Sequence, residues 1–153
     1  MRCFWTFIAV LFLLGCSVEV PRDEFVAYYD KKCKTEIERS GIHFFAMALI
    51  SDYELAKWGA PLDSGMRVIF GASPRSDLSF ETAFLISGRD TANVIVSRKM
   101  QTFEIGAADM FVLSFADRMD GAKLRLKNVS HGIGGVEIEL KDCRNIRLKE
   151  NKQ

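Results

Sequence analysis

The stretch AKLRLKN at residues 122–128, with VEIEL at residues 136–140, decides the fold that this sequence predicts. In both runs apolar residues alternate with charged ones, and a period of two places the two kinds on opposite faces of a β-strand. The loop between them, residues 130–135, holds three glycines and suits a hairpin connection. We therefore predict an antiparallel hairpin in which basic side chains of the first strand face Glu137 and Glu139 of the second.

Short runs of similar character predict further strands. They lie at residues 66–72, 80–87, 92–97 and 102–105, with 143–149 as a final edge strand. Residues 88–91 (GRDT) form a turn, so the runs on either side of it predict a second hairpin. The apolar run 42–50 fits a buried strand or the start of a helix, and we favour a strand because Gly41 ends the preceding helix.

Three segments carry helical signals. The first, residues 24–40, follows Asp23 as N-cap and is closed by Gly41, and its apolar residues recur at three- and four-residue steps. The second is a short helical turn at 51–58. The third, 107–120, fits a strand or a helix, and we favour a helix because Gly121 suits the position after a helix end. The expected fold class is α+β: a mostly antiparallel β-sheet with an N-terminal helix and a second helix packed on it.

The N-terminus has the features of a secretory signal. Arg2 precedes an apolar run, Cys3 to Leu14, which has the length of a signal-peptide core and is too short to cross a bilayer of ~30 Å. The residues Leu13-Leu14-Gly15-Cys16 then resemble the lipobox of bacterial lipoprotein precursors. This resemblance covers the N-terminus alone. The alternatives are an ordinary cleaved signal with an incidental cysteine, or an uncleaved anchor.

The lipoprotein resemblance implies cleavage after Gly15 and acylation of Cys16 with fatty chains such as palmitate. Two or more chains hold a protein stably on a membrane, because each buried CH₂ contributes about 0.8 kcal/mol. Ser17 stands where lipoproteins retained in the inner membrane typically carry aspartate, so the resemblance favours the periplasmic side of the outer membrane. The expected organisation is a signal peptide at 1–15, a lipidated tether at 16–22, one α+β domain at 23–149 and a polar tail at 150–153.

The four cysteines then reduce to one pair. Cys3 leaves with the signal and Cys16 is acylated, which leaves Cys33 and Cys143 in an oxidising compartment. We predict a disulfide between these two, joining the N-terminal helix to the last strand. Nothing like Cys-x-x-Cys indicates a redox-active pair, and no close spacing of ligands indicates a metal site.

Composition argues against nucleic acid as a partner. Lysine and arginine number 21 against 20 acidic residues, a formal net charge of +1. Binding to phosphates needs a marked excess of positive charge. The sequence also contains no cofactor motif.

Two groups of residues are candidates for a site. His131 lies in the glycine-rich loop, where it could act as a general base or ligand, or simply be solvated in a hairpin turn. A triad of His131 with Asp90, Asp109 or Asp117 depends on geometry that the sequence does not give. Amphipathic aromatic residues could instead line a partner surface or cover the core; they are Tyr28, Tyr29, Tyr53 and Trp58.

The sequence therefore predicts a membrane-anchored envelope lipoprotein that acts as a non-catalytic protein-binding module. Inhibitor or immunity, secretion-accessory and exclusion roles fit this class equally well. The expected partners are the lipid bilayer, through acylated Cys16, and an envelope protein. The alternative is a small periplasmic enzyme or ligand-binding domain centred on the His131 loop.

Overall fold

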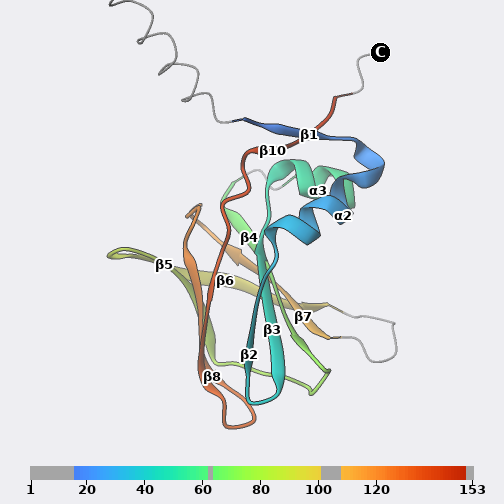
Figure 1. Ribbon diagram of the computed structural model, residues 1–153. Coiled ribbons are helices and arrows are strands. Elements are labelled where there is room, and N and C mark those ends of the chain that lie inside the picture. Colours follow the sequence, from blue (N-terminus) through green and yellow to red (C-terminus); the bar gives the residue numbers. More distant parts are fainter. Residues whose placement is uncertain (1–15, 62–63, 101–107, 151–153) are drawn as a thin grey trace, which may run out of the picture.

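The computed structural model describes residues 16–61, 64–100 and 108–150, which form an α+β fold with two helices packed on a strongly curved sheet (Figure 1). The elements are β1 (Val18–Val20), α2 (Arg22–Cys33), β2 (Thr35–Arg39), β3 (Ile42–Ala48), α3 (Ser51–Trp58), β4 (Met66–Ser73), β5 (Thr82–Ser87), β6 (Asp90–Met100), β7 (Asp109–Phe115), β8 (Lys123–Val129), β9 (Gly134–Glu139) and β10 (Ile146–Leu148). The predicted strand at 102–105 lies outside the described residues.

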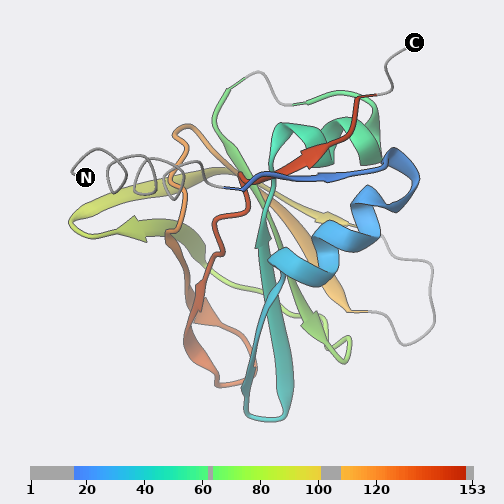
Figure 2. The same cartoon turned by 45° about the horizontal axis from the view of Figure 1, so that its top comes forward.

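Eight strands form one antiparallel sheet in the order β2-β3-β4-β7-β6-β5-β8-β9. Strand β9, at one edge, lies against β2 and β3 at the other edge. The sheet therefore curls until its edges nearly meet, and it encloses an almost complete barrel. Strands β1 and β10 form a separate parallel pair beside the two helices (Figure 2).

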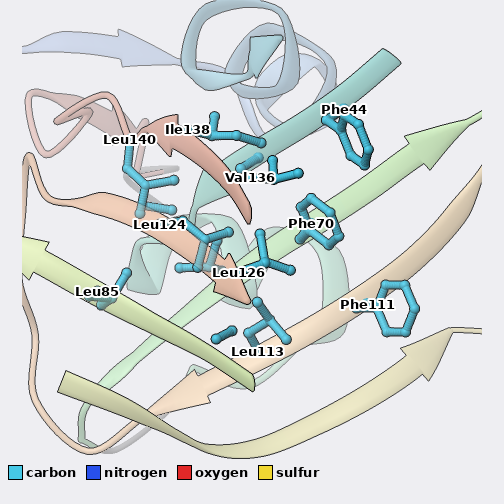
Figure 3. Close-up of a cluster of buried hydrophobic side chains, with 14 of the residues drawn as sticks. Phe44, Phe70, Leu85, Phe111, Leu113, Leu124, Leu126, Val136, Ile138 and Leu140 are labelled. Atoms are coloured by element: carbon cyan, nitrogen blue, oxygen red, sulfur yellow. The ribbon is translucent and has the colours of Figure 1, made fainter. Parts of the chain in front are cut away.

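Alternation along the strands fills the barrel with apolar side chains. Phe70 of β4, Leu113 of β7, Leu124 of β8 and Ile138 of β9 point into one common core (Figure 3). All four are at most 1% exposed. Burying a side chain of this size stabilises a fold by about 1.5–3 kcal/mol, so this core is a main source of stability.

Strands β3 and β4 are buried on both faces. Phe44 points into the barrel, whereas Met47 and Ile69 belong to a second core under the helices. That second core comprises Val20, Phe25, Tyr29, Cys33, Met47, Leu49, Ile50, Tyr53, Ile69, Cys143 and Ile146. A Cβ at Gly71 would lie 2.1 Å from the ring of Phe45, so glycine is the residue that lets this ring lie across β4.

Both predicted hairpins are confirmed. In the β8–β9 pair, Arg125 stands opposite Glu137 and Lys123 opposite Glu139. The Nε of Arg125 donates to Oε2 of Glu137 over 2.8 Å. These pairs are exposed to solvent, so each contributes little beyond fixing the register. Strands β5 and β6 form the other hairpin, and the strand at 42–50 and the helix at 51–58 are also confirmed as β3 and α3.

The predicted helix at 24–40 is wrong beyond Cys33. The helix ends there, and the chain continues as β2, in which Ile37 packs on the barrel core. Gly41, expected at the end of the helix, has φ of 76° in the turn that it forms with Ser40 between β2 and β3. A left-handed glycine suits a helix end and a tight hairpin equally, and this ambiguity produced the error.

The predicted helix at 107–120 is also wrong. Half of the segment is β7, where Phe111, Leu113 and Phe115 face the barrel in strict alternation. The strand pairs with β4 on one side and β6 on the other, and its inward side chains belong to the barrel core. Gly121 has φ of 70° in the turn that precedes β8. The second helix of the fold is α3.

A disulfide joins Cys33 at the end of α2 to Cys143, which precedes β10. Their Cα atoms are 6.1 Å apart, and both residues lie in the second core. The predicted bond is thus confirmed. It brings the C-terminal segment back to the helix layer, where β10 pairs with β1 in a segment that was expected to be tether.

We predict that a Cys33→Ala/Cys143→Ala variant will lose stability, because the bond closes a loop of 110 residues. The chain-entropy relation gives a loss of about 4–5 kcal/mol for a loop of this size. Urea unfolding of the soluble domain, with Cys16→Ser in every sample, would measure the loss. The parent protein, once its disulfide is reduced, should have the same free energy of unfolding as the variant. A variant as stable as the oxidised parent would contradict the prediction.

Candidate functional site

The anchor candidate, Cys16, is exposed and forms no disulfide. One residue, Ser17, separates it from β1. The backbone N–H of Val18 donates to the carbonyl of Asn145 over 2.9 Å, and that of Lys149 donates to the carbonyl of Val20 over 2.9 Å. The chain is therefore held in place almost immediately after Cys16, and the middle of the segment expected as a tether at 16–22 is strand β1.

Two of the candidate aromatic residues are core residues. Tyr29 and Tyr53 are 0% exposed, so neither is available to a partner, and the alternative that they cover the core holds for both. The hydroxyl of Tyr29 donates to the carbonyl of Ala48 over 2.7 Å. That of Tyr53 donates to Oδ1 of Asp30 over 2.9 Å. Burial raises the pKa of both hydroxyls, and the carboxylate of Asp30 raises that of Tyr53 further.

The other two aromatic residues reach the surface. Tyr28 is partly buried, and the ammonium of Lys32 lies 5.9 Å from the centre of its ring. Trp58, the last residue of α3, is 38% exposed. Its ring meets that of Tyr53 edge-on and lies 5.7 Å from the guanidinium of Arg67. Trp58 is therefore the candidate that the structure leaves open to a partner.

His131 occupies the loop between β8 and β9 with φ of 62°. Its Nε2 lies 2.8 Å from the carbonyl oxygen of Ser76. Next to it, the N–H of Ser130 donates to the carbonyl of Ser79, and the N–H of Ser79 donates to Oγ of Ser130. These bonds fasten the segment between β4 and β5 to the β8–β9 loop.

Asp109 holds the same segment from inside the barrel. It is 1% exposed, and its Oδ2 accepts the N–H groups of Ser76 (2.9 Å) and Leu78 (3.0 Å). Its Oδ1 lies 2.8 Å from Nζ of Lys99. Asp109 and His131 therefore meet at Ser76, one at its N–H and the other at its carbonyl. This geometry holds a loop in place and is not that of a carboxylate orienting a catalytic imidazole.

Burial of the Asp109 carboxyl would by itself raise its pKa. The N–H of Leu78, the ammonium of Lys99 and the N–H of Ser76 outweigh this effect and hold the pKa below its ordinary value. The group therefore stabilises the fold when it is ionised. That contribution is complete above the ordinary pKa and is lost as the pH falls through the lowered one.

Sequence reasoning missed an exposed, partly apolar groove on the outer face of the sheet. Helices α2 and α3 cover the outer face of β3 and β4, and Met110 of β7 packs against the second core, but the rest of the outer face of β6 and β7 is open (Figure 1). A groove of about 380 Å³ lies there. Its lining, which we name the β6–β7 face, consists of Trp58, Arg67, Val96, Arg98, Met100, Val112 and Ser114.

The path of β6 explains the exposure of this face. Strand β5 pairs only with residues 90–93 of β6, whereas β7 pairs with the part from Val94 onwards. A bulge at the crossover leaves Ile95 64% exposed and Val96 49% exposed. Arg98 has no carboxylate in ion-pair range among the described residues. The face therefore combines apolar side chains with positive charge.

Two other kinds of feature were sought within the described ranges. No group of three or more His, Cys, Asp or Glu residues there is arranged to hold a metal ion. No helix in the same ranges is long and apolar enough to cross a membrane. Comparison of the whole chain with protein-family models, curated proteins and solved structures found no match.

We predict that Asp109→Asn will lower the free energy of unfolding by about 2 kcal/mol at neutral pH, since hydrogen bonds to a charged group are worth roughly 1.5–3 kcal/mol. The difference in the free energy of unfolding between parent and variant should narrow as the pH falls below about 4, because Asp109 of the parent then becomes protonated. Urea unfolding at neutral and acid pH would measure both values. The exposed Asp117→Asn is the matched control and should change stability by less than about 0.5 kcal/mol. A gap that persists unchanged in acid would contradict this account of Asp109.

Proposed function

We propose that this chain is a lipid-anchored protein of the bacterial cell envelope that binds another envelope protein through its β6–β7 face. The observation that carries the binding role is the exposure of Val96, which is 49% exposed in a groove that it shares with Val112 and Met100. Exposed apolar patches with a charged rim are typical of protein-binding surfaces. The role is non-catalytic, of the inhibitor, immunity, secretion-accessory or exclusion kind.

The proposed location rests on the N-terminus and on the redox state. Leu13-Leu14-Gly15-Cys16 resembles a lipobox, and exposed Cys16 is accessible to acylation. The Cys33–Cys143 bond supports an oxidising compartment, since disulfides are rare in the bacterial cytosol. Ser17 in place of aspartate favours the outer membrane, with the domain on the periplasmic side.

The structural role of the polar candidate residues also favours a binding function over a catalytic one. His131 and Asp109 each use a hydrogen bond to hold Ser76. Residues committed to a loop in this way are structural, which makes an active site centred on His131 the weaker explanation. No residue of the β6–β7 face, in contrast, belongs to either of the two cores.

The anchor predicts a specific mass and location. Protein from the membrane fraction should have the mass of residues 16–153 plus acyl chains, and should gain about two hydrogens when the disulfide is reduced. Cys16→Ser should move the protein to the soluble periplasmic fraction, whereas Ser17→Ala, which leaves Cys16 in place, should remain in the membrane. A membrane-bound chain without acyl groups would contradict the anchor.

The binding surface predicts the effect of a single charge. Val96→Asp places a carboxylate in the β6–β7 face and should weaken binding more than roughly tenfold, a loss of about 1.4 kcal/mol. Thr91→Asp, at an exposed position of β6 remote from the groove, should leave the Kd unchanged. The partner would first be crosslinked to the anchored protein in intact cells and identified, then purified and titrated with each variant. Loss of function in His131→Ala, with Val96→Asp unaffected, would favour the ligand-site alternative instead.

A further inference from the structure

The anchor sets the orientation of the domain as well as its location. We propose that the end formed by β1, β10 and α3 rests on the phospholipid surface, with the barrel projecting away from the membrane. This inference depends on the acylation of Cys16 proposed above. It goes further because lipoproteins with long, flexible tethers would have no fixed orientation.

The link between lipid and fold is very short. Two peptide steps join Cys16 to Val18, and each spans at most about 3.6 Å, so the acylated residue lies within about 7 Å of β1. The whole domain must therefore sit against the headgroups when the acyl chains are in the bilayer. Only the direction in which it faces then remains to be decided.

That direction is fixed because β1 does not move independently. It pairs with β10 through Val18–Ile146 and Val20–Leu148, and Val20 is buried. The N–H of Leu148 also donates to Oδ2 of Asp52 over 2.8 Å, which joins β10 to α3. The disulfide at Cys143 ties the start of the same segment to α2. The attachment point is thus part of a braced layer.

The surface of this layer suits a lipid interface. Five large apolar residues are exposed in the described part of the chain, and three of them belong to β1 and α3: Val18 (39%), Leu55 (37%) and Trp58 (38%). Leu55 borders a hollow together with Glu19, Arg147 and Lys149. Leu55 and Trp58 are three residues apart and share one side of α3.

The residue types support the same assignment. Tryptophan is enriched where a membrane meets water, because its ring is apolar and its N–H is polar. Lysine and arginine at the same level can extend to lipid phosphates. Three acidic residues, Glu19, Asp52 and Glu150, and two basic ones, Arg147 and Lys149, surround the hollow. The surface therefore favours a largely zwitterionic phospholipid bilayer over a strongly anionic one.

The rest of the molecule fits this orientation. In Figure 1, β1, β10, α3 and the described ends of the chain gather at the top, whereas the β2–β3 and β8–β9 turns lie at the bottom. The bottom of the barrel would point away from the bilayer. The β6–β7 face, which includes Trp58, would lie on the flank, so that Val96 and Val112 remain within reach of a partner in or near the same membrane.

The chain carries its own reporter for this arrangement. The two tryptophans are Trp5, inside the predicted signal peptide, and Trp58. After cleavage Trp58 alone remains, so its fluorescence reports the distance of α3 from the membrane. The acylated protein would be placed in vesicles of phosphatidylethanolamine and phosphatidylglycerol containing a fraction of lipid with brominated acyl chains, which quench tryptophan on close approach.

The expected result is strong quenching of Trp58 that falls by roughly twofold or more when twelve Gly/Ser residues are inserted after Ser17, because such a linker has a root-mean-square reach of about 20 Å. A matched variant, Trp58→Phe/His43→Trp, moves the reporter to the exposed start of β3 and should show little quenching. Circular dichroism would confirm that each variant is folded.

Equal quenching with the native and extended tethers, whether strong or weak, would overturn the proposed orientation. So would equal quenching of the reporters at positions 58 and 43. The intact mass of each sample separates this outcome from failure of the anchor. A chain without acyl groups refutes the anchor itself, whereas an acylated chain with equal quenching refutes only the orientation.

Discussion

The pairing of β3 with β4 is the constraint on which the rest of the structure depends. These two strands are buried on both faces, so they contribute to the barrel core through Phe44 and Phe70 and to the helix layer through Met47 and Ile69. A strand pair with one solvated face would support only one of these layers. Gly71 has no side chain, so the ring of Phe45 can lie directly on β4 and pack against the core under the helices.

Much of the sheet could be predicted from local pattern, because alternation has a direct physical meaning in a strand. The β8–β9 hairpin and the disulfide followed from residues 122–140 and from the elimination of two cysteines. The failures share one cause. Gly41 and Gly121 adopt left-handed conformations in turns between strands, and the same conformation ends helices. Residues 107–120 fit both the two-residue period of a strand and the 3.6-residue period of a helix. Pairing with β4 and β6, which the local pattern does not contain, decides in favour of the strand.

The candidate site was less predictable because its parts are distant in sequence. Trp58 was identified from its residue type, but the groove also needs Val96 and Val112, brought beside it by the order of strands. Burial of Tyr29 and Tyr53 depends on how α2 and α3 cross, which a single sequence does not specify. The role of Asp109 depends likewise on backbone groups of a distant loop.

The pairing of β1 with β10 joins the first and last strands of the described chain, and this has a consequence for the order of folding. Synthesis proceeds from the N-terminus, so residue 18 becomes available long before residue 146. The barrel can assemble from its own hairpins, but β1 has no partner until nearly the whole chain is available. The pair of β1 and β10 would therefore be the last part to form, and a C-terminally truncated chain would leave Val20 and Phe25 without their cover.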